Sequence, residues 1–518
     1  MVFGPIALAL AIISASSTFI LLVAVSLLAV LWHRNAQRYP APLPPGPKPY
    51  PLIENILDLP RTRPWSAFKK WADAYGSIVH VSAFGQHFIV INDAQYATEM
   101  LDKKSRIYSG RPKLAMAGRL VGWEEGPALQ QSGAKLSEYR RRLSQFMGTR
   151  SKIEAFHDIL QQEADTYLEN ILNDSQNWLK YAHRYASGIV LMLVYGYKTS
   201  GNEDDAMVEL VDEAMDQLSE VIAPNAFLVD TFPILQYVPS WVPGAAWKKK
   251  AHHYRRTLHD VLNIPYSWTK TQIAAGTARP SFVSSQLDTT KLLSSDDEHI
   301  IRMSAVSISA GGTDTTVSAI EAFFMAMIFH RSAQLKAQKE IDSVVGHDRL
   351  PTLEDREQLP YVEALIQETL RVYSLGPIGI PHALSENDIH HGYFIPKGSV
   401  IFTNNVMFYN DPKVYPEPEK FSPERFLASN GNSIQKDPRE YLFGFGRRVC
   451  PGMHLGNASV WLACATVLAA FDVSPAVKNG VTVMPSGNFT DGIVSHPEPF
   501  ECTITPRSTS VVALLQKS

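Results

Sequence analysis

One stretch of ten residues, Phe443-Gly-Phe-Gly-Arg-Arg-Val-Cys-Pro-Gly452, restricts the fold of this chain more than any other. It holds a single cysteine, Cys450, in a loop with two glycines. Gly444 and Gly446 can adopt positive φ angles, which lets backbone amides approach the sulfur closely. Pro451 suits the first position of a helix, and the apolar residues that follow continue with helical periodicity. The stretch therefore predicts a cysteine at the N-terminus of a helix.

The sequence around Cys450 indicates a metal ligand. A helix N-terminus carries partial positive charge, and Arg447 and Arg448 are close neighbours of the cysteine. We expect these charges to lower the pKa of the thiol and to favour the thiolate, which is the form that binds metals. A lone cysteine in a glycine-rich turn is more often a buried structural residue, so companion motifs must decide between the two interpretations. A metal bound by one thiolate would point to haem iron.

A second motif, Ala310-Gly-Gly-Thr-Asp-Thr-Thr316, lies in a long predicted helix. This helix should begin near Ser295 with a capped, acidic first turn and end at about His330. Two glycines cost a helix about 1 kcal/mol each relative to alanine, and their missing side chains leave space at its surface. A flat cofactor and a diatomic gas would need that space. The alternative is a close contact between two helices.

A third pattern joins Glu368 and Arg371, which are three residues apart and therefore on one face of a predicted helix. Such pairs are common and contribute little when they are exposed. A further arginine follows in Pro423-Glu-Arg-Phe426. If the three side chains were buried together, removal of one would be costly.

These motifs together resemble the cytochrome P450 superfamily. Five residues occupy all fixed positions of its Phe-x-x-Gly-x-Arg-x-Cys-x-Gly signature, namely Phe443, Gly446, Arg448, Cys450 and Gly452. The resemblance covers about residues 40–507. Within the superfamily, the chain is similar to fungal microsomal members of secondary and xenobiotic metabolism. It implies a mainly α fold with a small β region, in which haem b lies between the long central helix and the cysteine loop with its helix. Cys450 would be the iron ligand.

The resemblance also implies roles in oxygen chemistry and in support of the loop. Thr315 would donate a hydrogen bond to dioxygen at the iron, and Asp314 would help to supply protons through water. Glu368, Arg371 and Arg425 resemble the buried Glu-Arg-Arg network of the family, which holds the cysteine loop.

Contacts with the haem propionates and the substrate are implied in the same way. Arg111, Arg140 and His382 resemble propionate-binding residues, together with Arg448 of the signature. Leu136 stands where the family has tryptophan, so one expected hydrogen bond to a propionate is missing. The residues expected to line the substrate pocket are Gly311, Ile378 and Ile493.

The N-terminal segment Met1–Trp32 has no charged side chain, and its apolar core Ile6–Leu31 exceeds the roughly 20 residues that span a bilayer. A cleaved signal peptide is the alternative, but a basic n-region is missing. Arg34, Arg38 and Lys48 follow the span, so the side after it should be cytosolic. We expect a single-pass anchor in the endoplasmic reticulum membrane at 1–32, a Pro-rich linker at 33–51 and the catalytic domain at 52–518.

Two other segments carry structural predictions. Alternating residues from Ile78 to Phe84 and from Phe88 to Ile91 predict a hairpin that turns at Gly85-Gln86. The proline-punctuated, apolar segment Phe227–Gly244 is similar to the family's lid over the substrate pocket, and its surface could touch the membrane.

Composition and missing motifs restrict the partners. A net charge of −3 and a pI near 6.6 give no basic surface for nucleic acid. Three cysteines without paired spacing argue against disulfides and a zinc site. A complete Gly-x-Gly-x-x-Gly dinucleotide fingerprint is missing. Electrons should therefore come from a separate flavoprotein. The resemblance implies an NADPH-dependent reductase in the same membrane, with cytochrome b5 left open as a second donor.

The resulting hypothesis is a monooxygenase that uses O2 to oxidise a hydrophobic small molecule. Terpenoids, polyketides, steroid-like compounds and aromatic xenobiotics are the substrate classes considered. Two alternatives remain open from the sequence. One is a haem-thiolate isomerase or dehydratase that needs no oxygen, against which the Asp314-Thr315 pair argues. The other is a membrane protein that binds haem or sterols without turnover.

Overall fold

The computed structural model describes residues 23–26, 39–60, 62–199, 205–223, 226–287, 293–428 and 433–516. The chain divides into two compact units. The first comprises Met1–Pro44 and Asn387–Lys397, and the second comprises Pro45–Glu386 and Gly398–Ser518. The expected membrane anchor at 1–32 lies outside the described residues except for 23–26, which are helical.

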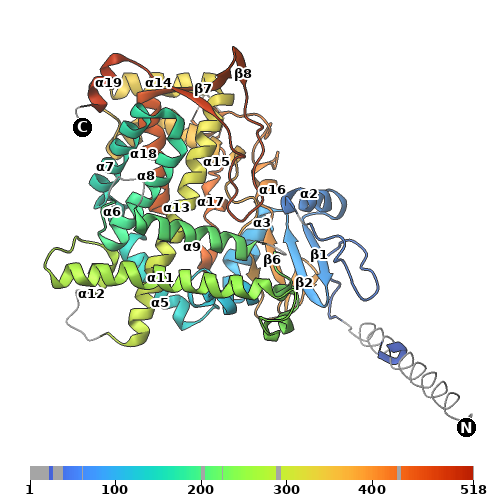
Figure 1. Ribbon diagram of the computed structural model, residues 1–518. Coiled ribbons are helices and arrows are strands. Elements are labelled where there is room, and N and C mark those ends of the chain that lie inside the picture. Colours follow the sequence, from blue (N-terminus) through green and yellow to red (C-terminus); the bar gives the residue numbers. More distant parts are fainter. Residues whose placement is uncertain are drawn as a thin grey trace, which may run out of the picture. The chain divides into compact units, whose positions relative to one another are not determined.

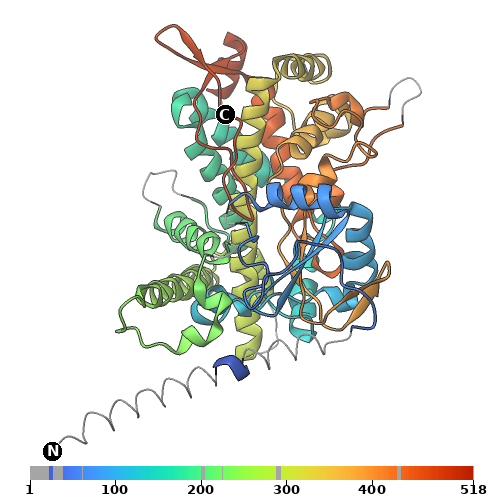
Figure 2. The same ribbon diagram turned by 90° about the vertical axis from the view of Figure 1, so that its right-hand side faces the viewer.

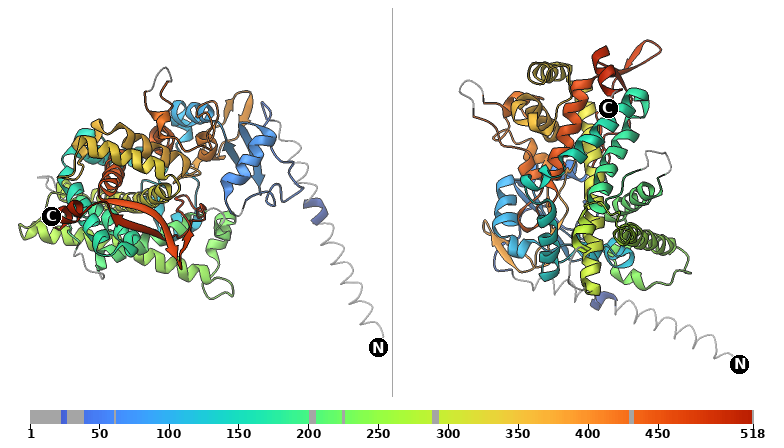
Figure 3. Two further views of the ribbon diagram at one scale, coloured as in Figure 1. Left: turned by 90° about the horizontal axis from the view of Figure 1, so that it is seen from above. Right: turned by 90° about the vertical axis from the view of Figure 1, so that its left-hand side faces the viewer.

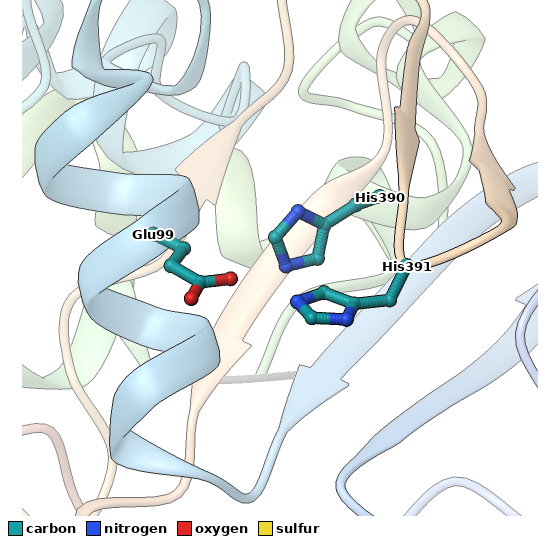
Figure 4. Close-up of side chains that lie close together, drawn as sticks. All are labelled: Glu99, His390 and His391. Carbon is teal, nitrogen blue, oxygen red and sulfur yellow. The ribbon is translucent and has the colours of Figure 1, made fainter.

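The described part of the first unit is built on one hairpin. Strand β4 (Asp388–His390) pairs antiparallel with β5 (Tyr393–Ile395), and the Phe394 amide donates a hydrogen bond of 2.8 Å to the Pro42 carbonyl. The imidazole rings of His390 and His391 lie where the hairpin turns, with centroids 4.6 Å apart (Figure 4).

The second unit is mainly helical, which confirms the predicted fold class. Its α-helices are α2 (Pro64–Tyr75), α3 (Ala94–Ala97), α4 (Ser105–Tyr108), α5 (Ala134–Met147), α6 (Arg150–Glu154), α7 (His157–Asn173), α8 (Trp178–Tyr195), α9 (Ala206–Ile222), α10 (Leu228–Thr231), α11 (Ala246–Ala274), α12 (Phe282–Leu287), α13 (Ser295–Phe329), α14 (Arg331–Val344), α15 (Pro360–Val372), α16 (Asn405–Tyr409), α17 (Arg439–Leu442), α18 (Met453–Ala470) and α19 (Thr509–Leu515). The π- and 3-10 helices are η1 (Thr98–Lys103), η2 (Ala115–Val121), η3 (Trp123–Glu125), η4 (Ser175–Asn177), η5 (Pro233–Tyr237), η6 (Leu353–Gln358), η7 (Pro423–Phe426) and η8 (Gly446–Arg448).

Two small sheets complete this unit. Their strands are β1 (Ile78–Ala83), β2 (Gln86–Ile91), β3 (His382–Ala383), β6 (Val400–Thr403), β7 (Phe471–Lys478), β8 (Val481–Val483) and β9 (Cys502–Pro506). One sheet has the order β1-β2-β6-β3 and the other β8-β7-β9. The predicted hairpin is confirmed, although it turns one residue earlier than expected, at Phe84-Gly85, where both residues have positive φ.

Helix α13 is the central element of the second unit. Ser294 caps it. The Ser294 hydroxyl accepts a hydrogen bond from the Asp297 amide, and the Asp297 carboxylate accepts one from the Ser294 amide. The predicted start and end of this helix are therefore confirmed. Figures 1 and 2 show α13 running through the unit, and α8 packs along it. The four-stranded sheet lies on one side and the helices α9 and α11 lie on the other (Figures 2 and 3).

Among the described residues, α18 is long and apolar enough to cross a membrane. Most of it is buried inside the protein, including Trp461, Leu462 and Ala465 at 0% exposure. A helix that is apolar on all sides and covered by its own protein is a core helix. α18 therefore belongs to the core, and it directly follows the cysteine loop.

Candidate active site

The cysteine loop adopts the backbone that its glycines allow. Gly444 and Gly446 have φ angles of 77° and 52°, so the predicted positive torsions are confirmed. A Cβ atom at Gly446 would lie 2.5 Å from the carbonyl oxygen of Leu101 in η1. The Cys450 amide donates a hydrogen bond of 2.7 Å to the Phe443 carbonyl and closes the loop. Glycine is thus required at 446 by both its torsion and its close neighbour.

Two expectations about the surroundings of Cys450 are wrong. α18 begins at Met453, so Pro451 does not open the helix and instead lies with Gly452 in the turn before it. Burial raises the pKa of the Cys450 thiol above its ordinary value, while the Gly452 amide and the Arg140 guanidinium act in the opposite direction. The expected lowering fails because desolvation of the thiolate outweighs both contacts.

Arg448, which belongs to the loop, and Arg111 both bind main-chain carbonyls of other segments. Arg448 donates through Nε and Nη1 to Ser109 and Pro127, each at 2.9 Å, and through Nη2 to Gln130. Arg111 is 5% exposed. It donates to Ala128 at 3.0 Å, Ile380 at 2.6 Å and Pro381 at 2.7 Å.

Arg140 is the cation whose charge acts on the Cys450 thiol. Its Nη1 donates a hydrogen bond of 2.9 Å to the carbonyl of Val449, the residue before Cys450. Leu136, one turn earlier in α5, is buried at 5% exposure. The side chain that replaces the expected tryptophan therefore packs into the core.

His382 is buried beside these arginines. Its Nδ1 donates a hydrogen bond of 2.7 Å to the Tyr108 carbonyl. Burial, followed by the charge of Arg111, lowers the pKa of His382 to about 3. The ring is therefore neutral, with a lone pair at Nε2. It could bind a carboxylate through Nε2 only with a second proton, which the carboxylate itself would favour.

The donor set at this site fits a haem. Arg111, Arg140 and Arg448 have no carboxylate within ion-pair distance in the described part of the chain, and burial lowers the pKa of each guanidinium. Buried cations are normally paired. One buried cation, Arg111, and two half-buried ones, Arg140 and Arg448, near a thiol match a metal cofactor that carries two carboxylates of its own.

The middle of α13 carries the second predicted motif. Gly311 and Thr315 are exposed, although residues 316–328 of the same helix are buried. A Cβ atom at Gly311 would meet nothing within 4 Å, whereas one at Gly312 would lie 2.8 Å from Val190 of α8. Gly312 therefore lies at a close contact between two helices, whereas Gly311 leaves open space at the helix surface, and the use of that space by a cofactor stays a prediction. The Thr315 hydroxyl donates a hydrogen bond of 2.7 Å to the Gly311 carbonyl.

The three predicted network residues meet in the core. Glu368 and Arg371 have side chains at 0% exposure and are joined at 2.8 Å, and Arg425 of η7 binds the same carboxylate at 3.0 Å. Arg371 also donates to the Tyr409 carbonyl at 2.9 Å. The network therefore connects α15 with the segment that leads to the cysteine loop.

A second connection between α15 and the loop was not predicted. Arg439 of α17 pairs with Glu363 of α15 at 2.7 Å and with Asp437 at 2.6 Å. Gln367 donates to Asp437 at 3.0 Å. Glu363 and Gln367 are four residues apart, and this spacing next to Glu368 was the available signal.

Sequence reasoning also missed the partners of Asp314. Its Oδ1 lies 3.1 Å from His496 Nε2, and His496 Nδ1 lies 2.6 Å from Glu321 Oε2. Burial alone would lower the pKa of His496, but the bonds to Asp314 and Glu321 raise it to about 10. The signal was the spacing of Asp314, Ser318 and Glu321, which places three polar residues on one face of an apolar helix.

The two remaining pocket residues differ. Ile493 is half-buried in the loop after β8, and its carbonyl would lie 3.9 Å from a Cβ at Gly376. Ile378 is 1% exposed and packs with Phe68, Val79 and Val90 in the core. Its side chain faces the core between α2 and the sheet, so we do not include it in the pocket.

The structure combines one cysteine in a glycine loop, arginines without a carboxylate partner among the described residues, and a glycine that leaves open space on the central helix. These are features of a haem-thiolate protein. Comparison with known proteins agrees. Residues 44–504 match the family model described as cytochrome P450. The chain belongs to the cytochrome P450 family.

Three similar proteins are fungal monooxygenases. The chain is 45% identical to cytochrome P450 monooxygenase 208 of Postia placenta, over 95% of this chain and 96% of the relative. It is 40% identical to cytochrome P450 monooxygenase claR of Ampulloclitocybe clavipes, over 92% and 88%. Tryptamine 4-monooxygenase of Psilocybe cyanescens is 34% identical, over 95% and 99%. The protein is therefore an oxidoreductase that incorporates oxygen from O2.

Proposed function

We propose that this enzyme is anchored in the endoplasmic reticulum membrane and hydroxylates hydrophobic small molecules with electrons from an NADPH-dependent reductase. The observation that carries the proposal is the combination of Cys450 with the guanidinium groups of buried Arg111 and half-buried Arg140 and Arg448, which have no carboxylate partner among the described residues. When bound, haem b supplies oxygen activation, which thiolate ligation favours by promoting O–O cleavage.

The residues of the chain have separate roles in this proposal. Cys450 ligates the iron, and Arg111, Arg140 and Arg448 bind the propionates as charge-assisted donors. His382 joins them in its doubly protonated form. Thr315 positions a proton at the open face of α13, and Asp314 delivers protons to it through water. The Glu368 network and Arg439 hold the cysteine loop and take no part in chemistry.

The proposed substrate classes are supported by the relatives and by the hydrophobic substrates that the family generally uses. Terpenoids, polyketides, steroid-like compounds and aromatic xenobiotics remain the candidates. One relative is named for tryptamine, which keeps small aromatic amines within this range. Gly311 and Ile493 are the proposed pocket residues.

An exposed apolar surface supports the proposed membrane association. The lid segment around α10 and η5 exposes Leu228 at 71%, Ile234 at 72%, Tyr237 at 70% and Trp241 at 81%. Exposed apolar groups that gather in one segment mark an interaction surface. We propose that this lid contacts the membrane in which residues 1–32 are anchored, with 33–51 as linker and 52–518 as the cytosolic catalytic domain.

The test begins with the purified full-length protein. Haem content and the absorption of the reduced carbon monoxide complex should be normal in the wild type and lost in Cys450→Ser. A Cys450→Ser variant that keeps both would contradict the proposed ligand. Cys464→Ser, which changes a buried cysteine of α18, is the matched control.

Catalysis is tested separately in a yeast strain that expresses the protein with a reductase and receives a panel of lipophilic compounds. Consumption of NADPH and O2 with formation of an oxygenated product, reduced in Thr315→Ala, supports a monooxygenase. Conversion without O2 would support the isomerase or dehydratase alternative. Ligand binding without conversion across the panel would favour the binding-protein alternative.

A further inference from the structure

We propose that His496 is a positioning residue for Asp314, held in place by Glu321 and by the loop that carries it. The proposal rests on the role proposed above for Asp314. It concerns residues 488–498, which we call the C-terminal loop, and the face of α13 formed by Asp314, Ser318 and Glu321.

Both ring nitrogens of His496 are used by carboxylates of α13. Nε2 donates to Asp314 Oδ1 at 3.1 Å and Nδ1 donates to Glu321 Oε2 at 2.6 Å. A neutral imidazole has one N–H, so both contacts together require the imidazolium. The raised pKa of His496 agrees with this requirement. Glu321 is 7% exposed, and its buried charge needs this cation.

The backbone on both sides of His496 is fixed. Ser318 donates through its hydroxyl to the Ser495 carbonyl at 2.8 Å, and the Ser495 amide donates to the Leu375 carbonyl at 2.8 Å. The His496 amide donates a hydrogen bond to the Thr490 hydroxyl at 3.0 Å, and the Thr490 amide donates one to the His496 carbonyl at 2.8 Å. The imidazolium therefore stands at a fixed point beside α13.

A fixed cation restricts the carboxylate that it binds. With Oδ1 held by His496, rotation of the Asp314 carboxylate is limited, and Oδ2 keeps a defined direction. Asp314 directly precedes Thr315, so this direction determines where a proton can be passed. Misplacement of a catalytic group by about 1 Å can cost a hundredfold in rate.

The neighbouring charges make His496 important for a second reason. Asp212 and Asp216 of α9 and His183 of α8 face the same cluster. Burial, then Asp216 and Asp314, raises the pKa of Asp212 to about 6. Burial lowers the pKa of His183. Among these six groups, His496 is the one that carries positive charge at neutral pH, and it offsets the acids around Asp314.

The first test is a double-mutant cycle on NADPH-dependent oxygen consumption with a reductase and no added substrate. Asp314→Asn and His496→Gln should each lower the rate about tenfold, and the double variant should be no slower, because both act through one carboxylate. His347→Gln, which removes an exposed histidine 3.7 Å from Asp342, is the control and should not change the rate.

Each outcome of this cycle has a separate meaning. If Asp314→Asn is unchanged, the proposed role of Asp314 fails and this proposal fails with it. If Asp314→Asn is slow but His496→Gln is normal, only the positioning role is refuted. It is also refuted if the two effects multiply in the double variant, since His496 would then act independently.

The second test does not depend on activity. Exchange of the imidazole C2 hydrogen for deuterium, followed by mass spectrometry of the peptide that contains His496, gives the pKa of this ring in the holoenzyme. The midpoint should lie above that of an ordinary histidine and should fall in Glu321→Gln. Amides of the C-terminal loop should exchange faster in the same variant. A midpoint at the ordinary value, unchanged in Glu321→Gln, would overturn the proposal.

Discussion

Replacement of Glu368 by glutamine should destabilise the protein far more than the same change at an exposed site. The Glu368 carboxylate accepts four hydrogen bonds: two from Arg371 at 2.8 Å, one from Arg425 at 3.0 Å and one from the Ser422 amide at 2.8 Å. Glutamine keeps the shape but has one acceptor oxygen and turns its NH2 group toward a guanidinium. Two buried cations then lose their counter-charge.

The expected cost is about 3–5 kcal/mol, the range for removing one partner from a buried ion pair. Unfolding entropy is about 2.1 cal/mol/K per residue. Over the matched residues 44–504 this amounts to about 1 kcal/mol/K, so the melting temperature should fall by about 3–5 °C.

The assay is thermal unfolding of the holoprotein, followed by circular dichroism and by haem absorption. Glu417→Gln is the matched control, because Glu417 also pairs with a cation three residues away, Lys420, but both side chains are more than 60% exposed. It should change the melting temperature by less than about 1 °C. A Glu368→Gln variant that melts like Glu417→Gln would refute the argument that burial makes this network costly to break.

Three further predictions compare pairs of variants or conditions. Gly446→Ala should lower haem content and melting temperature, because its Cβ would meet the Leu101 carbonyl, whereas Gly480→Ala has positive φ but no neighbour within 4 Å and should cost only about 1 kcal/mol. Gly311→Ala should raise the melting temperature slightly but disturb the haem spectrum, and Gly312→Ala should lower the melting temperature through contact with Val190. Because the pKa of His496 is raised to about 10 from 6.5, its stabilisation is complete below pH 6.5 and is lost as the pH rises through 10. Melting curves of the wild type and His496→Gln should therefore differ most near pH 6 and converge by about pH 10; a difference that grows with pH would contradict this sign.

The cysteine loop and the start of α13 could be predicted because their signals are local. Positive φ at Gly444 and Gly446 and the cap at Ser294 depend on residues within a few positions of one another. The pairing of Glu368 with Arg371 follows from helical spacing in the same way. These local features could therefore be predicted without knowledge of the rest of the molecule.

The wrong or missing predictions concern burial and long-range contacts. The pKa of Cys450 is raised by desolvation, which depends on everything that surrounds the loop. Asp314 and His496 are 182 positions apart, and no local pattern joins them. Ile378 belongs to the core because α2 and the sheet cover it, and a run of apolar residues does not indicate which side is covered.

The pairing of β2 with β6 affects how the chain is made. Phe88 in β2 faces Val400 in β6, so the sheet is completed only by residues 312 positions later. At about 5–20 residues per second, a ribosome needs tens of seconds to add them. During that time the apolar edge Phe88-Ile-Val-Ile91 can hydrogen-bond to other nascent chains. Polypeptides truncated before residue 400 should therefore aggregate, and chaperones that cover extended segments should raise the yield of the full-length enzyme.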